Sequence, residues 1–178
     1  GQDISHFIPH LNLPKDKNIA LRGEFIISKD NFKEHFKDRR VPRNTVAGIM
    51  NKHTIDKKVI KQLMYVDFVV YEAIKPTKLS PSEQFEFAKK LDNLHVVQQV
   101  KRTTLDIKDL STILTDWREN HKYQIDGIII THDISHISRH RTNPSYAFAF
   151  KMVLSDQKAE TKVVDVIWNP SKDGYLKP

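Results

Sequence analysis

The sequence contains neither cysteine nor a long apolar run, and each absence excludes a class of protein. Without cysteine, the chain has no disulfide framework, no thiolate metal site and no cysteine nucleophile. No stretch approaches the length of a membrane span or of the apolar part of a signal peptide, so we expect no membrane partner. These absences predict an intracellular protein, and they leave cytoplasm, nucleus and virus-associated sites open.

Basic residues dominate the charge balance. The 178 residues include 29 lysines and arginines against 22 acidic residues, which gives a formal net charge of +7. The basic residues gather at 33–43, 52–61, Arg139 and Arg141, a spread typical of surfaces that follow a phosphate backbone. Many basic domains bind no nucleic acid, so charge alone leaves the partner open. The length suits one domain, or one domain plus a fragment of the next.

Apolar periodicity predicts an α+β chain in which strands and helices alternate irregularly. Ser80 and Glu83 form a capping box around Pro81, which predicts that a helix begins there. The segment 41–48 is predicted to be a loop. The predicted strands are residues 19–27, 65–74, 96–100, 128–131 and 146–153, and the other predicted helices are residues 29–39, 54–63 and 106–120.

Charged residues are embedded in several of these strands. Arg22 and Glu24 fall on one face of the first strand, and Lys151 lies in the last. Asp126 stands just before the β-branched run at 128–131. Such charges are costly to bury unless they meet each other or a ligand. A site for a nucleotide phosphate and a divalent metal uses this mixture of carboxylates and lysine, whereas salt bridges and a plain Asp-Gly turn explain it equally well.

Five motifs follow one another along the chain. They are LRGEF at 21–25, VPRNTVAGI at 41–49, FVVYEA at 68–73, QIDGIII at 124–130 and YAFAFKM at 146–152. Their order resembles that of the NAD-dependent DNA ligases, a branch of the covalent nucleotidyltransferases. The PRN segment is typical of this branch and not of the ATP-dependent ligases.

The resemblance implies a fold and a division of the chain. It implies the α+β covalent nucleotidyltransferase fold, which is ATP-grasp-like and built on antiparallel sheets. Residues 1–157 would form the adenylation domain, incomplete at its N-terminus. Residues 158–178 would begin an OB-fold, with a hairpin turn at Asp173-Gly174.

The resemblance also implies a nucleotide site. Glu24 would contact the AMP ribose, Tyr71 would stack on adenine, and Lys151 would touch the α-phosphate. Arg118 would help to position a phosphate of the nucleotide or DNA, and Arg43 would engage nicotinamide mononucleotide or the nick phosphates. The expected AMP donor is NAD.

Further implied roles concern the metal and the DNA. Asp126 would assist the nucleophile and hold Mg²⁺. The expected partner is nicked duplex DNA, bound by a monomer through lysine and arginine side chains. The residues expected to contact DNA are Arg22, Arg43, Arg139, Arg141 and Lys172.

Two lysines of the family pattern are missing. The K-x-D-G motif that carries the nucleophilic lysine does not occur, and we expect that lysine upstream of Gly1. Thr131 stands where the fourth motif ends in lysine, and Lys172 replaces an arginine. The alternatives are therefore an ATP-dependent ligase or capping-type enzyme, or a nucleic-acid-binding remnant without catalysis.

Three histidines offer a different interpretation. His132, His136 and His140 recur at every fourth position, the spacing of metal ligands on one face of a helix. The surrounding segment is rich in serine and β-branched residues, which disfavours a helix. We therefore expect a surface loop over DNA and no metal site.

Overall fold

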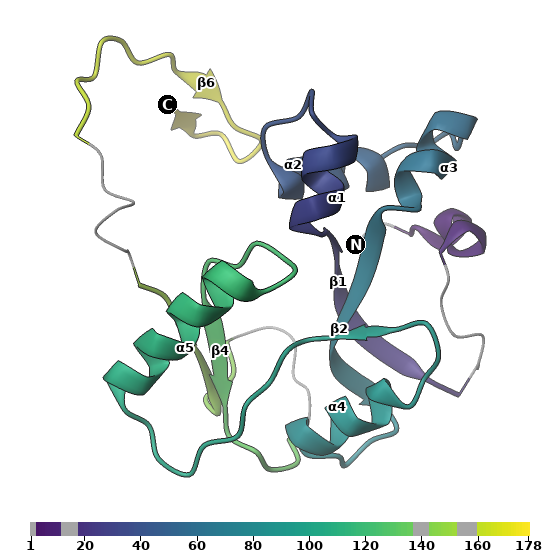
Figure 1. Ribbon diagram of the computed structural model, residues 1–178. Coiled ribbons are helices and arrows are strands. Elements are labelled where there is room, and N and C mark those ends of the chain that lie inside the picture. The colour runs from purple at the N-terminus through teal and green to yellow at the C-terminus, as the bar shows by residue number, and fades with distance from the viewer. Residues whose placement is uncertain (1–2, 12–17, 137–142, 153–159) are drawn as a thin grey trace.

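The computed structural model describes residues 3–11, 18–136, 143–152 and 160–178 (Figure 1). It is a mixed α/β chain with small sheets, as the sequence predicts. In chain order the elements are η1 (Ser5–His10), β1 (Ala20–Ile27), α1 (Lys29–His35), α2 (Pro42–Met50), α3 (Lys57–Leu63), β2 (Val66–Lys75), α4 (Pro81–Lys89), β3 (His95–Val96), α5 (Ile107–Asn120), β4 (Ile128–Thr131), β5 (Ala147–Phe150), β6 (Asn169–Pro170) and β7 (Leu176–Lys177).

Within the described residues, the strands form three separate sheets. β1 and β2 pair antiparallel along their whole length, as do the strands of the hairpins β4–β5 and β6–β7. β3 adds to β2 in the parallel direction, through residues His95 and Val96 only. The strand predicted at 96–100 is therefore wrong beyond Val96, because the chain leaves the sheet after Val97 N donates to Val70 O.

Helix α2 occupies the segment that was predicted to be a loop. That prediction is wrong because Pro42 begins the helix, where its missing N–H has no partner to lose and its fixed φ fits the first turn. Val46, Ile49 and Met50 then bury one face of α2. The helix places Arg43 in its first turn, with an exposed side chain.

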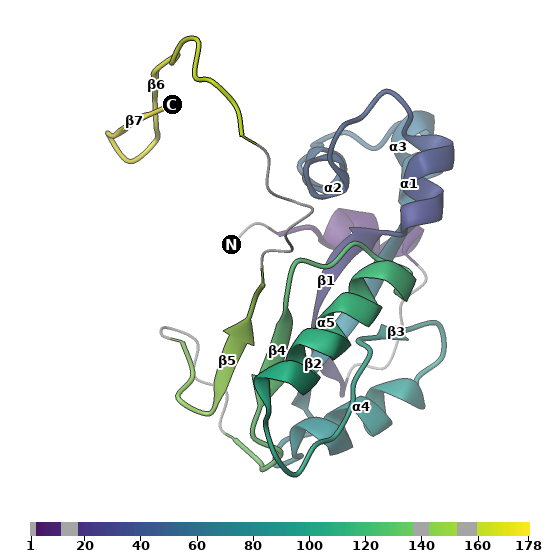
Figure 2. The ribbon, with the colours of Figure 1, turned by 60° about the vertical axis from the view of Figure 1, so that its left-hand side comes forward.

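Helix α4 begins where the sequence predicts. The Ser80 side chain accepts a hydrogen bond from Glu83 N, and the Glu83 carboxylate accepts one from Ser80 N, which completes the capping box. Helix α5 also matches its predicted range of 106–120, with Asp106 as N-cap. Its apolar face packs on β4, through Leu110, Leu114 and Ile128 (Figure 2).

A larger core lies where β1 ends and β2 begins. It joins η1, the end of β1 and the helices α1 to α3 around fully buried phenylalanines. Its buried residues are Phe7, Ile27, Phe36, Val46, Ile49, Met50, Val59, Leu63 and Val66.

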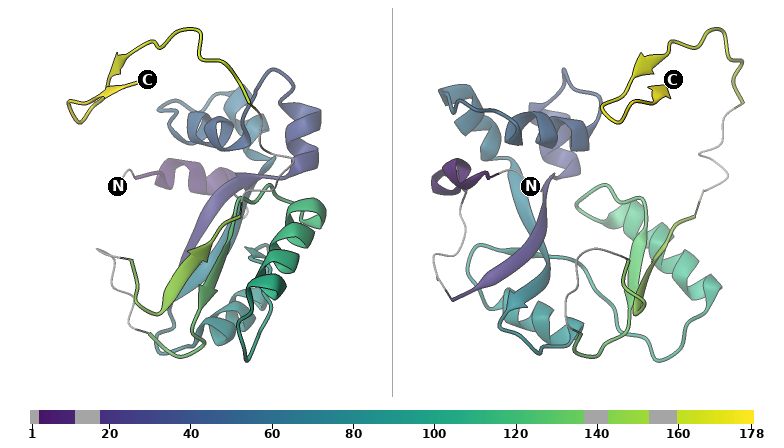
Figure 3. Two further views of the ribbon diagram at one scale, coloured as in Figure 1. Left: turned by 90° about the vertical axis from the view of Figure 1, so that its left-hand side faces the viewer. Right: turned by 180° about the vertical axis from the view of Figure 1, so that it is seen from behind.

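The hairpin β6–β7 stands away from both other sheets in every view (Figures 1 and 3). The predicted turn at Asp173-Gly174 is confirmed, since Gly174 N donates to Ser171 O at 3.1 Å. Side chains of the hairpin are exposed, among them those of Tyr175 and Leu176. No helix in the described part of the chain combines the length and the apolar character that crossing a membrane requires.

Candidate functional site

Asp126 and Lys151 meet at the ends of neighbouring strands. Asp126 lies two residues before β4, Lys151 directly follows β5, and Lys151 Nζ is 2.9 Å from Asp126 Oδ2. The hydrogen bond from Lys151 lowers the pKa of Asp126, and the charges of Lys151 and Arg43 act in the same direction. The side chains of Asp126 and Lys151 are 83% and 62% exposed. So exposed a pair contributes little to stability and is accessible to a ligand.

Gly127 allows the lysine to cross the hairpin. A Cβ atom at Gly127 would lie 2.8 Å from Lys151 Cγ and 2.9 Å from Phe150 O. Packed side chains do not approach so closely, so any other residue would push Lys151 away or open the hairpin. The Asp-Gly pair therefore has a packing role beyond that of a turn.

Arg118 fixes the main chain of Asp126. It lies in the last turn of α5, and its Nη2 donates a hydrogen bond of 2.8 Å to Asp126 O. Its Nη1 is buried and has no hydrogen-bond partner within the described ranges. The charge of Arg43 on α2 also acts on the Asp126 carboxylate. The structure thus groups four predicted site residues from four parts of the chain around Asp126. They are Asp126, Lys151, Arg118 and Arg43.

A second group of predicted residues lies on β1 and β2. Arg22 forms an ion pair with Glu72 on the neighbouring strand. The two side chains are 32% and 22% exposed, and the pair joins β1 to β2 at one register position. Glu24 follows on β1 with an exposed side chain, opposite Val69. The sequence analysis missed Glu72, although an acid inside the apolar run 68–73 is a signal that could have identified it.

Tyr71 lies at an irregularity in the strand pairing. The register passes from Arg22 opposite Glu72 to Gly23 opposite Val70, so Tyr71 is an extra residue on β2. Such bulges redirect a side chain from the regular alternation and are common beside active sites. Tyr71 is 44% exposed, so its side chain is accessible for stacking. Partial burial raises the pKa of the Tyr71 hydroxyl, with a smaller contribution from nearby carboxylates.

The remaining predicted residues lie elsewhere. Lys172 is exposed in the turn of hairpin β6–β7, and the structure does not bring it to either group. Arg139 and Arg141 lie outside the described residues. Thr131 ends β4 opposite Ala147, so the position that carries lysine in the family pattern supplies no charge here.

Two of the three histidines have contacts that do not form a metal site. The His136 ring stacks on Tyr146 with centroids 3.6 Å apart, and its Nε2 lies 3.2 Å from His132 O. His140 lies outside the described residues. Within the residues that the structure describes, no group of three or more His, Cys, Asp or Glu side chains could hold a metal ion.

Asp67 joins the segment before Asp126 to β2, a contact that the sequence analysis missed. Tyr123 Oη donates a hydrogen bond of 2.7 Å to Asp67 Oδ2, and Lys122 Nζ lies 2.8 Å from the same oxygen. His95 Nε2 lies 3.4 Å from Asp67 Oδ1. Tyr123 is buried, and burial with the Asp67 bond raises its pKa, so its hydroxyl stays protonated. An acid in the strand 66–75 is the signal that could have identified this contact.

Asp133 joins the other end of β4 to α4. Its carboxylate accepts hydrogen bonds from Ser82 N and Ser82 Oγ, at 2.9 and 2.8 Å. Lys101 Nζ lies 2.6 Å from Asp133 Oδ2. The Lys101 and Ser82 bonds lower the pKa of Asp133 to about 2. The hairpin β4–β5 is therefore held to the larger sheet and its helices at both ends of β4.

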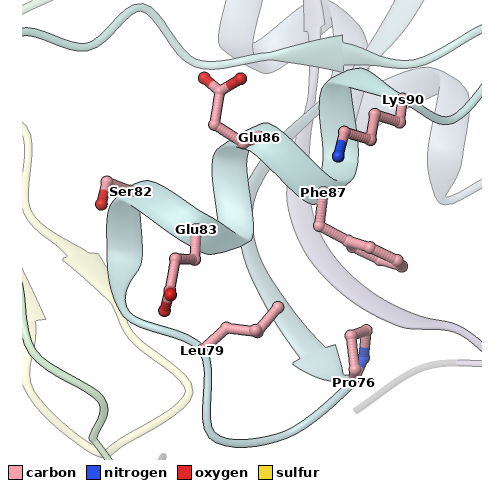
Figure 4. Close-up of a pocket in the computed structure, with 7 residues that line it drawn as sticks. All are labelled: Pro76, Leu79, Ser82, Glu83, Glu86, Phe87 and Lys90. Carbon is pink, nitrogen blue, oxygen red and sulfur yellow. The ribbon is translucent and has the colours of Figure 1, made fainter.

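We consider two surface pockets that described residues form. One has a volume of about 380 Å³, is formed by α4 and the loop before it (Figure 4), and contains none of the predicted site residues. Glu83 and Glu86 line it with one cation, Lys90, and this excess of negative charge disfavours a phosphate ligand. The other pocket has a volume of about 360 Å³, and its lining residues Pro42 and Gln124 are near Arg43 and Asp126 in the sequence. It is lined by Ile27, Lys29, Phe32, Arg40, Pro42 and Gln124.

Comparisons with known proteins agree with the motif order. The family model described as NAD-dependent DNA ligase adenylation domain matches residues 2–154. A DNA ligase of Acanthamoeba polyphaga mimivirus is 38% identical over 187 residues, which cover all of this chain and 28% of that protein. A DNA ligase of Clostridioides difficile is 30% identical over 202 residues, which cover all of this chain and 29% of that protein.

A DNA ligase of Fervidobacterium nodosum is 26% identical over 184 residues, which cover 94% of this chain and 26% of that protein. The chain therefore spans less than a third of the length of each of these three relatives. What such a relative does as a whole protein involves residues beyond those compared with this chain.

Proposed function

Because this chain belongs to the family of NAD-dependent DNA ligase adenylation domains, we propose that the complete protein containing it seals nicks in duplex DNA. NAD would donate AMP, which passes to the 5′-phosphate of the nick and is then displaced by the 3′-hydroxyl. The observation that carries this proposal is the exposed Asp126–Lys151 pair, held by Arg118 and within reach of the charge of Arg43. The family match favours this function over an ATP-dependent ligase, a capping-type enzyme or a remnant without catalysis.

The residues grouped around Asp126 would act on the phosphates of the nucleotide and the DNA. Phosphoryl transfer asks a protein mainly for in-line positioning and for neutralisation of charge. Lys151 would bind the α-phosphate, leaving Asp126 free to assist the attacking group. Arg118 and Arg43 would position the nucleotide and nick phosphates. Because Thr131 stands in place of a lysine, Lys151, Arg118 and Arg43 would neutralise a larger share of the phosphate charge.

The second group would hold the rest of the nucleotide. Glu24 would accept hydrogen bonds from the ribose hydroxyls, for which its exposed carboxylate is suited. Tyr71 would stack on adenine with the exposed part of its ring. DNA phosphates would be bound by basic side chains, in keeping with the net charge of +7. These are Arg22, Arg43, Arg139, Arg141 and Lys172.

Mg²⁺ fits this arrangement through Asp126. In nucleotide sites Mg²⁺ is usually bound by one or two carboxylates together with phosphates and water. Asp126 offers one exposed carboxylate, which is enough when a nucleotide supplies the other oxygen ligands. When bound, the ion would neutralise part of the phosphate charge.

We also propose the finer description of the fold. Residues 1–157 would form the covalent nucleotidyltransferase domain, which is ATP-grasp-like, and residues 158–178 would begin an OB-fold. The hairpin β6–β7 supports this division, because its exposed Tyr175 and Leu176, with Trp168 directly before β6, suit a strand pair that packs in a barrel. We propose that the protein acts on nicked duplex DNA as a monomer, since both groups of site residues come from one chain.

The test is nick sealing by the complete protein. We expect sealing of a labelled nicked duplex with NAD and Mg²⁺, and no sealing with ATP in place of NAD. Lys151→Ala should lower the rate of sealing about 100-fold or more, because it removes a cation from the transferring phosphate. The exposed pair contributes little to stability, so the midpoint of thermal unfolding should stay nearly unchanged.

Three results would contradict the proposal. Sealing at the wild-type rate by Lys151→Ala would show that the site is misplaced. Transfer of labelled AMP from ATP and not from NAD would place the protein in the other ligase branch. DNA binding without any AMP transfer would favour a remnant that has lost catalysis.

A further inference from the structure

We infer that Lys29 is a positioning residue for the Asp126–Lys151 site, and this inference rests on the function proposed above. Lys29 is the first residue of α1, directly after the buried cap Ser28. Its Nζ donates hydrogen bonds to Arg118 O at 2.7 Å and to Glu119 O at 3.1 Å. Its main-chain N donates to Lys122 O at 2.9 Å. One residue therefore makes three bonds to the end of α5 and the turn that follows.

The bonded carbonyl groups lie where a helix has free acceptors. The last turn of an α-helix leaves its carbonyl groups without partners inside the helix, and these carry partial negative charge. A lysine from the same helix would satisfy them without fixing the helix to anything else. Lys29 instead comes from α1, about 90 residues earlier, so it fixes the end of α5 against the end of β1.

Arg118 transmits this position to the site. Its carbonyl oxygen accepts from Lys29, while its side chain donates to Asp126 O at 2.8 Å. Asp126 then holds Lys151 through its carboxylate, at 2.9 Å. Any shift of Arg118 would therefore move Asp126, and with it the partner of Lys151.

The position of Lys29 also relates the two groups of site residues. Glu24 lies on β1, which ends two residues before Lys29. The bonds from Lys29 thus help to set the distance between the strand that carries Glu24 and the segment that carries Asp126, together with the bonds of Tyr123 and Lys122 to Asp67. A transfer in line requires both groups to act on one nucleotide, and a misplacement of about 1 Å can cost on the order of 100-fold in rate.

Direct contact with a ligand is the competing role for Lys29. Its side chain also lines the pocket of about 360 Å³ together with Arg40 and Gln124. A residue that binds a phosphate would change the KM for NAD or the Kd for DNA. A positioning residue would change kcat, because the ligand still binds while the reacting groups are misaligned.

The experiment compares Lys29→Met, Lys29→Arg and Lys108→Met in the complete protein. Lys108 is an exposed lysine at the opposite end of α5 and serves as the matched control. We expect Lys29→Met to lower kcat for sealing about 10- to 100-fold while KM for NAD and Kd for nicked DNA change less than about threefold. Lys29→Arg keeps donors for two carbonyl groups and should recover most of kcat. Lys108→Met should match the wild type.

Hydrogen exchange supplies a readout that does not depend on sealing. In Lys29→Met, amides of the segment 121–127 should exchange about tenfold faster, because the end of α5 loses both side-chain bonds from Lys29 and only the main-chain bond to Lys122 O remains. Lys108→Met should leave that exchange unchanged. If the wild type does not seal nicks, the proposed function fails, while this measurement still decides whether Lys29 positions Asp126.

Several outcomes would overturn the inference. An unchanged kcat in Lys29→Met would do so, as would a rise in KM or Kd with kcat unchanged. Unchanged exchange in segment 121–127 would show that Lys29 does not fix the turn. If Lys29→Met does not fold, Lys29→Gln takes its place, and the same results with that variant decide the matter.

Discussion

Lys151 Nζ lies 2.9 Å from Asp126 Oδ2 because Gly127, between them, has no side chain. The stem of Lys151 occupies the space in which a Cβ atom at Gly127 would lie. The Asp-Gly pair thus supplies both the carboxylate and the room for the lysine to reach it. A change at Gly127 should therefore affect the site without removing either charge.

Gly127→Ala should destabilise the hairpin and lower the rate of sealing. The added methyl group would lie 2.8 Å from Lys151 Cγ and 2.9 Å from Phe150 O, so the hairpin or the lysine must move. We expect a loss of about 1–3 kcal/mol in the free energy of unfolding, the usual cost of overpacking. Urea unfolding measures this loss, and a nick-sealing assay measures the rate.

Gly48→Ala is the matched control for stability. Gly48 lies within α2, and a Cβ atom there would meet nothing within 4 Å. Alanine in a helix is favoured over glycine by roughly 1 kcal/mol, so this variant should be slightly more stable than the wild type. Equal effects of the two alanines on stability would show that the close contact at Gly127 has no consequence.

Glu24→Ala should abolish sealing and leave the fold intact. Glu24 is exposed on β1, so loss of its carboxylate creates no cavity. A hydrogen-bonding group lost from the nucleotide site should lower the rate about 100-fold or more. Single-turnover sealing and thermal unfolding together test this prediction, with the exposed Glu34→Ala on α1 as control. If Glu24→Ala seals nicks at the wild-type rate, the ribose role is wrong.

Local patterns in the sequence predict helices well where the signal is a cap. The capping box at Ser80 and Glu83 predicts the start of α4 correctly, because both of its bonds join residues three apart. The loop predicted at 41–48 is wrong because Pro42 marks the first turn of a helix there and not an interruption. Proline is thus typical both of loops and of the first turn of a helix. The buried face of α2 shows that the second case applies here.

The site is predictable only in part for a different reason. Motif order indicates Asp126 and Lys151, and the structure brings them together. The extra residue at Tyr71 and the bonds of Lys29 depend on pairing between segments about 50 and 90 residues apart. No spacing along the chain carries that information, because strand register and helix position are fixed by packing.

Acid should destabilise the protein through Asp133. Lys101 and Ser82 lower the pKa of Asp133 to about 2, whereas an unfolded aspartate titrates near about 3.9. A folded-state pKa below the unfolded value means that the contribution of Asp133 to stability is present in full above about pH 5. This contribution is lost as the pH falls toward 2. Urea unfolding between pH 7 and 2 measures it as a falling free energy of unfolding.

Asp133→Asn should reduce the dependence on pH in that window. The variant cannot lose a proton, so its free energy of unfolding should be lower at pH 7 and should fall less steeply between pH 5 and 2. Asp92→Asn, in the exposed turn after α4, should retain the slope of the wild type. Parallel curves for the wild type and Asp133→Asn would show that the bonds to Ser82 and Lys101 do not stabilise the fold.

The 178-residue chain by itself should bind nicked duplex DNA weakly and form no covalent adduct with AMP. Dispersed lysines and arginines that contact phosphates release counterions, so affinity should fall about tenfold to 100-fold between 50 and 200 mM salt. The sequence has no K-x-D-G lysine. Lys151 is a poor substitute, because a lysine that neutralises the α-phosphate cannot also attack it in line.

Fluorescence anisotropy with a nicked duplex at the two salt concentrations tests the first half of this prediction, after circular dichroism has shown that the chain is folded. Intact mass after incubation with NAD and Mg²⁺ tests the second half. Binding that does not respond to salt would show that phosphate contacts are not its source. AMP linked to any lysine of this chain, located by peptide mapping, would contradict this prediction. It would show that a lysine outside a K-x-D-G motif can act as nucleophile, and Lys151 would be the first lysine to substitute.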